Sequence, residues 1–434
     1  MRLTTRPELK YRSAALYPGR GGASRRRAAG LLAALMAALM APAGFAQPFR
    51  DAFQSVTDVN FDDGGSPSRQ FHLNAASYHP QATIYRTTPP RALRRREASP
   101  VAAIRVRHDD TESRFADYVA TDPLLDAVLV LHEGEVAFEA YPNMQPWQRH
   151  FAWSVTKVLT STTLATLVAD GRVAMHEPVA RYVPELADSA WGTIPLQNLA
   201  DMASGIDCLD SDGYQDQETC VYRLEESLGL TASTGRELDF VDTLKSMQRR
   251  GKPGEINEYV SANTNVLALV IENVLQLDFA AAVRERVWSR IGAEADAFIT
   301  VNDKGYAYAS GGLSARLRDL GRFGEVFMPY DESGVLSEEL RAAMANGGVP
   351  LDDPDGLKSR FGSDVPVRAS WQWDLVWEDG AMFKGGYSGQ GLYVDPKREL
   401  VVAWFGTGLD YSARVNAMLP MARQLSQGLD SPEP

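Results

Sequence analysis

Apolar runs that are typical of buried strands lie near both ends of the main region of this chain. Residues 127–138 contain two short apolar runs around a turn, and residues 390–405 repeat that arrangement. Residues 173–290, which lie between them, have a largely helical pattern. This order predicts an α+β fold in which one antiparallel sheet is formed by both termini of the domain, with helices on its faces and a helical insertion.

The N-terminal residues have the pattern of an export signal. The basic stretch Arg25 to Arg27 precedes an apolar run at 28–39, and small residues follow up to Ala46. This pattern predicts a signal peptide over 1–46 and a periplasmic or secreted bacterial protein. A retained membrane anchor is the alternative, although the run is short for a span. The route of export and the true start codon stay open.

Two further regions follow the predicted signal. Residues 47–118 are rich in turn residues, with Gly64 to Pro67 and the pair Pro89-Pro90 as examples. We expect an irregular N-terminal arm there that either wraps the domain or is partly disordered. Residues 119–430 form the predicted main domain. After the first fifty residues no apolar run reaches twenty residues, so we expect no stable membrane insertion once the signal is cleaved.

The charge of the chain limits its partners. The formal net charge is −12, and residues 1–46 carry eight basic residues and one acidic residue. Removing their net charge of +7 leaves −19 on the rest of the chain. Such an acidic body argues against nucleic acids and anionic membranes as partners. A small-molecule amide, ester or short peptide is the expected partner, and the sequence does not indicate an oligomeric state.

Cys208 and Cys220 are the two cysteines of the chain. They flank an acidic, turn-rich segment, and in an oxidising compartment a disulfide that closes this loop is the favoured interpretation. Free thiols and a metal site are the alternatives. No histidine lies beyond His176, so a Cys/His zinc cluster would lack nearby ligands. The loop 207–220 could border a substrate pocket and select an amine.

The S-x-x-K sequence of Ser154 and Lys157 occurs once in the chain. An apolar pattern at near-helical spacing follows it, so a helix is predicted to begin at about Ser154. At positions i and i+3 the two side chains share one face of the helix, and a buried neutral lysine can accept the proton of a serine hydroxyl. The alternative makes Ser154 a helix cap and Lys157 a solvated residue.

Tyr259 lies at the end of a turn, just before a predicted apolar helix over 266–274. A tyrosine beside a lysine can be held as a phenolate or pass protons. Ser261 or Asn263 could add a polar contact to a substrate. The alternative is a packed surface tyrosine before a helix.

A glycine-rich segment opens the predicted strand near residue 390 and reads Lys384-Gly385-Gly386-Tyr387. The glycines would let a substrate approach the strand edge, and Lys384 would add positive charge near a carboxylate. The N–H of Tyr387 could act as an oxyanion donor together with that of Ser154. The alternative is a hairpin corner with a solvated lysine.

The three motifs, in this order, resemble the serine β-lactamase and penicillin-binding protein superfamily. The tyrosine of the second motif is similar to that of the class C branch, and three connecting stretches also resemble that branch: 173–186, 199–206 and 311–324. The stretch 202–206 and the predicted strand 387–394 look most like the 6-aminohexanoate-dimer hydrolases. The resemblance covers residues 120–425 and implies a β-lactamase/transpeptidase-like fold without a metal or organic cofactor.

The resemblance also implies a mechanism. Ser154 would form an acyl-enzyme, Lys157 and Tyr259 would move the proton, and the N–H groups of Ser154 and Tyr387 would hold the oxyanion. Two motifs depart from the usual pattern. Ser261 stands where an asparagine is usual, and Gly385 lacks the hydroxyl that commonly contacts a carboxylate, which argues against efficient β-lactamase activity.

Other interpretations of the site stay open. An α/β-hydrolase is disfavoured because the chain has no G-x-S-x-G sequence. A triad with His132 or His150 would require residues that we expect in turns or at the surface. The fold also allows a non-catalytic or single-turnover sensor, a true β-lactamase or a D-alanyl carboxypeptidase. A tryptophan cluster before the third motif belongs either to the sheet core or to a pocket wall: Trp371, Trp373 and Trp377.

Overall fold

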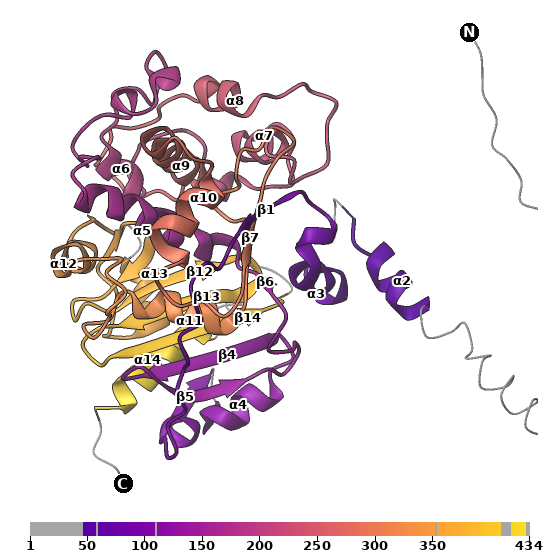
Figure 1. The fold of residues 1–434 in the computed structure, drawn as a ribbon, viewed down its shortest axis with the longest axis vertical. Helices are drawn as coiled ribbons and strands as arrows, with labels where there is room; N and C mark the ends of the chain where they lie inside the picture. Colours follow the sequence, from indigo (N-terminus) through magenta and orange to yellow (C-terminus); the bar gives the residue numbers. More distant parts are fainter. Residues whose placement is uncertain (1–46, 58–59, 109–110, 352–353, 409–417, 431–434) are drawn as a thin grey trace, which may run out of the picture. The chain divides into compact units, whose positions relative to one another are not determined.

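In a computed structural model, one eight-stranded antiparallel sheet contains both ends of the main domain. Its strand order is β5-β4-β14-β13-β12-β11-β10-β9, so the end strands β4 and β14 lie second and third from one edge. The N-terminal strand β4 pairs directly with the C-terminal strand β14, with Val128 opposite Trp404. In Figure 1 the purple strands β4 and β5 therefore lie beside the yellow strands. The predicted fold class is confirmed. The strands of the sheet are β4 (Leu125–His132), β5 (Glu135–Ala140), β9 (Val349–Pro350), β10 (Arg368–Ser370), β11 (Trp373–Val376), β12 (Met382–Gly386), β13 (Gln390–Asp395) and β14 (Leu400–Gly406).

The structure describes residues 47–57, 60–108, 111–351, 354–408 and 418–430. The predicted signal peptide at 1–46 lies outside these residues. The chain divides into two units, Met1–Asp51 and Ala52–Pro434, and the account below concerns the second.

Both faces of the central strands are buried. In β4, Leu129 and Leu131 belong to one hydrophobic cluster, whereas Val128 and Val130 belong to another on the opposite face. Successive side chains of a strand point to opposite faces, so a strand covered on both sides needs a continuous apolar run. This is why these residues have no polar alternation in the sequence.

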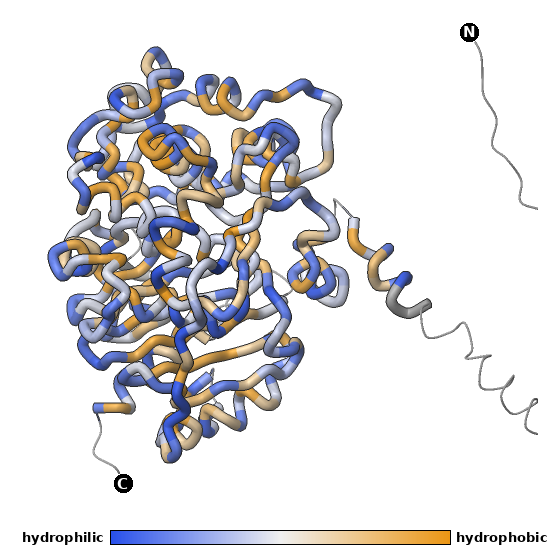
Figure 2. The backbone as a smooth tube through the Cα atoms, viewed as in Figure 1, coloured by the Kyte–Doolittle hydropathy of each residue, from blue (hydrophilic) through white to orange (hydrophobic). Residues whose placement is uncertain are grey.

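Helices cover the sheet and form the insertion. Helices α5 and α9 pack against each other in the insertion, while α11 packs on β4 and β14 and α14 packs on β13. Figure 1 shows the insertion as the magenta part of the chain, and Figure 2 shows hydrophobic residues concentrated along strands and helices. The helices are α2 (Gln47–Gln54), α3 (Gly65–Asn74), α4 (Phe115–Thr121), α5 (Thr156–Ala169), α6 (Leu196–Ala200), α7 (Cys220–Ser227), α8 (Phe240–Ser246), α9 (Ser261–Leu275), α10 (Phe279–Val283), α11 (Leu317–Glu325), α12 (Glu338–Asn346), α13 (Pro354–Phe361) and α14 (Met418–Gly428).

Helix α11 presents two glycines to the sheet. A Cβ atom on Gly321 would lie 2.5 Å from Leu129 Cδ2, and one on Gly324 would lie 2.5 Å from Val401 Cγ1. Real Cβ contacts are essentially never this short, so larger residues would push α11 away from β4 and β14.

The segment 47–118 contains regular structure, in contrast to the irregular arm that the sequence predicts. Strand β1 (Gln81–Ile84) pairs with β7 (Ala297–Thr300) in a second sheet, and β2 (Arg105–His108) pairs with β3 (Thr111–Arg114). The second sheet continues through β8 (Leu313–Ala315) and β6 (His150–Phe151). The strands of the second sheet are short and pair with distant residues, so local periodicity does not reveal them.

No single helix among the described residues is long and apolar enough to span a membrane. Only a bent pair, Ser261–Leu275 with Phe279–Trp288 at 78°, has the necessary length and composition. Many of its side chains are buried in the hydrophobic core, including Val270, Ala282 and Trp288.

Candidate functional site

Ser154 lies in a short 3-10 turn, Trp153–Val155, that leads directly into α5. Trp153 has φ of 46°, a left-handed conformation that is uncommon for a non-glycine residue and often marks a functional site. Strand β12 runs close to this turn. A Cβ atom on Gly386 would lie only 2.7 Å from the carbonyl oxygen of Ala152. Glycine at 386 therefore allows the end of β12 to reach the turn that carries Ser154.

Lys157 contacts the hydroxyl of Ser154 from one helical turn away. Its Nζ donates to Ser154 Oγ at 3.0 Å and to the carbonyl oxygen of Ser310 at 2.8 Å. The side chain of Lys157 is fully buried. Burial, assisted by the positive charge of Lys384, lowers the pKa of Lys157 from 10.5 to about 7. A large fraction of Lys157 is then neutral near neutral pH and able to accept a proton.

Tyr259 lies between two lysines. Lys384 Nζ donates to Tyr259 Oη at 2.9 Å and lies 4.5 Å from the centre of its ring, while Lys157 Nζ lies 5.0 Å from that centre. The sequence alone could not join these residues, because Tyr259 precedes α9 whereas Lys384 belongs to β12. Together they surround Ser154 with groups that can move protons.

The glycine-rich segment, which the sequence predicts to open a strand, instead ends β12 and forms the turn before β13. Gly385 and Gly386 end β12, and Tyr387 begins the turn Tyr387–Gly389. The ring of Tyr387 packs edge-on against Trp153, with the two ring centres 5.5 Å apart.

Two predicted contact residues have other roles in the structure. Ser261 begins α9, and its backbone N–H and hydroxyl both donate to the carboxylate of Asp210. Asn263 is fully buried one helical turn into the core and donates to Met202 Sδ at 3.5 Å. Neither side chain lines the cavity at Ser154. Ser261 instead fixes the acidic loop against the helix.

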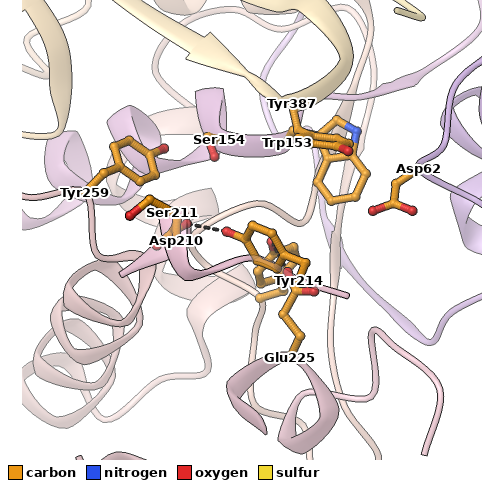
Figure 3. Close-up of a pocket in the computed structure, with 10 residues that line it drawn as sticks. Asp62, Trp153, Ser154, Asp210, Ser211, Tyr214, Glu225, Tyr259 and Tyr387 are labelled. Atoms are coloured by element: carbon orange, nitrogen blue, oxygen red, sulfur yellow. Dashed lines mark hydrogen bonds between the residues drawn. The ribbon is translucent and has the colours of Figure 1, made fainter. Parts of the chain in front are cut away.

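A cavity of about 410 Å³ opens beside Ser154. Figure 3 shows Tyr259 on one side of the serine and Trp153 with Tyr387 on the other, while Tyr214 and Glu225 lie together across the cavity. Among the described residues that line it, none is a lysine or an arginine. The lining residues are Asp62, Trp153, Ser154, Asp210, Ser211, Tyr214, Glu225, Tyr259, Tyr308 and Tyr387.

Three carboxyl groups give this cavity its electrostatic character. Burial and the neighbouring charges of Asp62 and Asp210 raise the pKa of Glu225 to about 8. Burial and the charge of Asp63 raise the pKa of Asp62 to about 6. In both groups burial is the largest cause of the shift, because it disfavours the charged form of a carboxyl group.

Two tyrosines hold these carboxyl groups in place. Tyr308 donates to Glu225 at 3.2 Å, and Tyr214 donates to Asp210.

The predicted disulfide between Cys208 and Cys220 is present, with the two Cα atoms 5.1 Å apart. It closes the loop that carries Asp210 and Tyr214, and Cys220 is also the first residue of α7, which carries Glu225. The disulfide therefore holds the loop and the helix that supply much of the acidic lining. A disulfide is also compatible with an oxidising compartment.

A buried polar network lies behind the turn Trp153–Val155. The indole N–H of Trp153 donates to His72 Nε2 at 2.9 Å, and His72 Nδ1 lies 3.3 Å from Thr407 Oγ1. Thr407 in turn donates to Asp126, which also contacts His150 Nε2 at 3.1 Å. Burial and the neighbouring His150 lower the pKa of His72 well below 6.5.

The expectation that His150 lies in a turn or at the surface is wrong, because this residue is fully buried in β6. Its Nδ1 lies 2.9 Å from the carbonyl oxygen of Phe151 and its Nε2 contacts Asp126, so both ring nitrogens are engaged away from Ser154. His132 is partly exposed at the end of β4 and contacts Arg96. Neither histidine forms a catalytic triad with Ser154.

The tryptophan cluster belongs to the core. Trp371, Trp373 and Trp377 are at most 3% exposed, and none of them lines the cavity.

The sequence did not reveal the cavity residues Asp62, Glu225 and Tyr308, since each lies in a different part of the chain and no motif surrounds it. Over the residues that the structure describes, no group of three or more metal-ligating side chains is suitably placed for an ion.

Comparisons with known proteins agree with the motifs. The family model Beta-lactamase matches residues 120–423. The 6-aminohexanoate-dimer hydrolase of Paenarthrobacter ureafaciens is 31% identical over 334 residues, which cover 75% of this chain and 84% of that protein.

Solved structures share the fold. The "Putative 6-aminohexanoate-dimer hydrolase from Bacillus anthracis" has a TM-score of 0.71 at 22% identity and covers 86% of this chain and 99% of its own. A class C beta-lactamase has a TM-score of 0.50 at 14% identity, covering 71% of this chain and 91% of its own. The resemblance predicted from the three motifs is thus confirmed, and the chain belongs to the beta-lactamase family.

Proposed function

We propose that this protein is a serine hydrolase that cleaves an amide or ester bond through an acyl-enzyme on Ser154. The observation that carries the proposal is the 3.0 Å contact between Lys157 Nζ and Ser154 Oγ, made by a fully buried lysine whose pKa is about 7. A serine hydroxyl is a weak nucleophile unless a base removes its proton. The family match supports a hydrolase of this superfamily.

The proposed reaction has two halves. Ser154 Oγ attacks the carbonyl carbon while its proton passes to Lys157, and the proton then reaches the leaving amine or alcohol through Tyr259. A water molecule reverses these transfers and releases the acid. The N–H groups of Ser154 and Tyr387 are proposed to hold the oxyanion, and removing one such donor typically costs about 3–4 kcal/mol of transition-state stabilisation.

The acidic lining favours a substrate with a cationic amine. Asp62, Asp210 and Glu225 line the cavity, and no lysine or arginine accompanies them among the described lining residues. A relative of this chain is named for the hydrolysis of a dimer of 6-aminohexanoate, an amino acid. We therefore propose that the substrate is an amide of an amino acid. Because the chain is acidic, its partners are proposed to be small molecules rather than nucleic acids.

The compartment is part of the proposal. The Cys208–Cys220 disulfide and the signal-like residues 1–46 together support export to the periplasm or the medium. Mass analysis of the exported protein would test this. A mature N-terminus near Gln47 is expected, and a cytoplasmic chain with free thiols would contradict it.

Hydrolysis of p-nitrophenyl hexanoate and its 6-amino analogue tests the activity. Wild-type protein is expected to turn over both esters, and Ser154→Ala and Lys157→Met to lose at least about a thousandfold in kcat/KM. Ser161→Ala is the matched control, because Ser161 lies on the same helix but donates to Trp371 in the core. Equal rates for Ser154→Ala and wild type would contradict the proposal.

The same assay separates the alternatives. Glu225→Gln should reduce the preference for the amino ester by about tenfold, the order of one charge-assisted contact. An unchanged preference would contradict the proposed amine site. Release of one equivalent of nitrophenol followed by no turnover would identify a single-turnover sensor instead of an enzyme.

A further inference from the structure

The ammonium group of Lys384 is the cation nearest to Tyr259, and it is already paired within the protein. Its side chain is fully buried, and its Nζ forms an ion pair with Asp374 Oδ1 in addition to the hydrogen bond to Tyr259. The side chain of Asp374 is 23% exposed, so its carboxylate is partly accessible to solvent whereas Lys384 is not.

The sheet holds Asp374 in this position. Strand β11 pairs with β12 in an antiparallel register in which Leu375 lies opposite Phe383. The next residues along this register are Asp374 and Lys384, which makes them cross-strand neighbours on one face. The second carboxylate oxygen of Asp374 accepts from the backbone N–H of Gly385 at 2.9 Å. Both oxygens are therefore engaged, one by Lys384 and one by the backbone.

This arrangement has a consequence for substrates. A buried lysine beside a reactive serine would attract a carboxylate on the substrate, since a paired charge is far less costly to bury than an isolated one. Asp374 supplies that carboxylate from within the chain. Asp62 and Asp210 also line the cavity and add repulsion toward an anion, whereas Glu225, with a pKa of about 8, is largely uncharged near neutral pH.

We propose that Asp374 is a specificity-determining residue that pairs with Lys384 internally and thereby disfavours substrates with a free carboxylate near the scissile bond. The inference rests on the proposed serine hydrolase activity. It assigns a function to a residue that lies outside the three motifs and that contacts the site only through the third.

Two esters that differ in one group test the inference. p-Nitrophenyl valerate ends its acyl chain in a methyl group, whereas the p-nitrophenyl monoester of glutaric acid ends a chain of the same length in a carboxylate. The wild-type enzyme is expected to prefer the neutral ester. In Asp374→Asn, Lys384 lacks its partner, and the anionic-to-neutral ratio of kcat/KM should rise by about tenfold, the order of one charge-assisted hydrogen bond.

A matched variant separates this role from a general charge effect. Asp62→Asn removes a carboxylate that lines the cavity, but Asp62 has no contact with Lys384. The anionic-to-neutral ratio of kcat/KM should therefore rise much less in this variant than in Asp374→Asn. Equal rises in the two variants would contradict the inference, and so would an unchanged ratio in Asp374→Asn.

A binding measurement keeps the test decisive if Asp374→Asn hydrolyses too slowly. Glutarate is expected to raise the melting temperature of this variant but not that of wild type, because a ligand that binds only the native state stabilises it. Absence of any shift in the folded variant, together with an unchanged or unmeasurable ratio, would overturn the inference. Failure of wild type to hydrolyse either ester would instead count against the proposed function.

Discussion

At the scale of single residues, the ionisation of Lys157 governs the proposed chemistry. A buried lysine next to a second lysine is costly to charge, which is why its pKa falls to about 7. The base must be neutral to accept the proton of Ser154, so the active form is the deprotonated one. Activity should therefore be present above about pH 7 and lost as the pH falls through this value.

The pH dependence of kcat/KM for a neutral ester checks this expectation. Between pH 5.5 and 8.5 the value should rise about tenfold for each unit below the pKa and level off above about pH 7. A neutral ester is needed so that the substrate does not titrate. A profile that is flat or declines over this range would rule out Lys157 as the base.

Gly386 is a second residue that determines the geometry of the site, because it has no side chain. Gly386→Ala places a Cβ atom 2.7 Å from the backbone oxygen of Ala152. Either β12 or the nucleophile turn, which is the turn Trp153–Val155 with the proposed nucleophile Ser154, must therefore shift. A displacement of about 1 Å at a reacting group can cost about a hundredfold in rate. Gly385→Ala is the comparison, because its Cβ atom would meet side-chain atoms rather than backbone, with Phe383 Cζ at 3.2 Å and Asp374 Oδ2 at 3.6 Å.

Steady-state kinetics on these two variants should give a much larger fall in kcat for Gly386→Ala than for Gly385→Ala. Melting temperatures establish that both are folded. Equal losses would mean that the close approach of β12 to the nucleophile turn is unimportant.

At the scale of elements, the nucleophile turn depends on segments that are distant in the sequence. A chain of hydrogen bonds runs from Trp153 directly to His72 of α3, and from His72 through Thr407, the residue after β14, to Asp126 of β4. Because Thr407 donates to Asp126, it can accept from His72 Nδ1–H, and this leaves Nε2 free to accept from the indole. Only neutral His72 in this tautomer satisfies every link.

Replacing His72 tests the importance of this chain. His72→Phe keeps the ring but removes the acceptor for Trp153, and we expect kcat to fall about tenfold to a hundredfold with little change in KM. His72→Gln retains an acceptor and a donor and should recover part of kcat. His132→Gln serves as the control, since His132 contacts Arg96 and not the nucleophile turn. Normal kcat in folded His72→Phe would contradict a positioning role.

At the scale of the whole molecule, the sequence was sufficient to predict features that depend on neighbouring residues or on the order of motifs along the chain. Apolar runs at 127–131 and 400–405 were sufficient to place both termini in one sheet, because a strand buried on both faces has few alternatives. The motifs at Ser154, Tyr259 and Lys384 were recognisable by their order. Each of these signals involves a few neighbouring residues.

Contacts between distant polar residues were beyond prediction. Asp374, His72 and Glu225 each lie in an ordinary local sequence, and they acquire their roles only when a partner from another element packs against them. The buried position of His150 was missed for the same reason, because its partner Asp126 lies on a different strand. Polar pairs of this kind leave no periodic pattern.

The arm before the matched domain is predicted to be required for folding and activity. Phe71 and Ile84 are at most 1% exposed and belong to the main hydrophobic cluster, and truncating such residues costs about 2–5 kcal/mol each. Removing both approaches the total stability of about 5–15 kcal/mol of a typical domain. A chain that begins at residue 119 should therefore not fold stably.

Thermal unfolding and ester hydrolysis compare that chain with one that begins at residue 47. The longer chain should unfold cooperatively and turn over substrate. A shorter chain with the same melting temperature and the same kcat would show that the arm is dispensable.

The most direct test of the proposed acyl-enzyme is to measure the mass of the protein during turnover of an ester and then to identify the modified peptide. The mass should increase by that of the acyl group, and the acyl group should be located on Ser154 and be absent in Ser154→Ala. An adduct on another residue, or efficient turnover by Ser154→Ala, would contradict the central claim that Ser154 is the nucleophile.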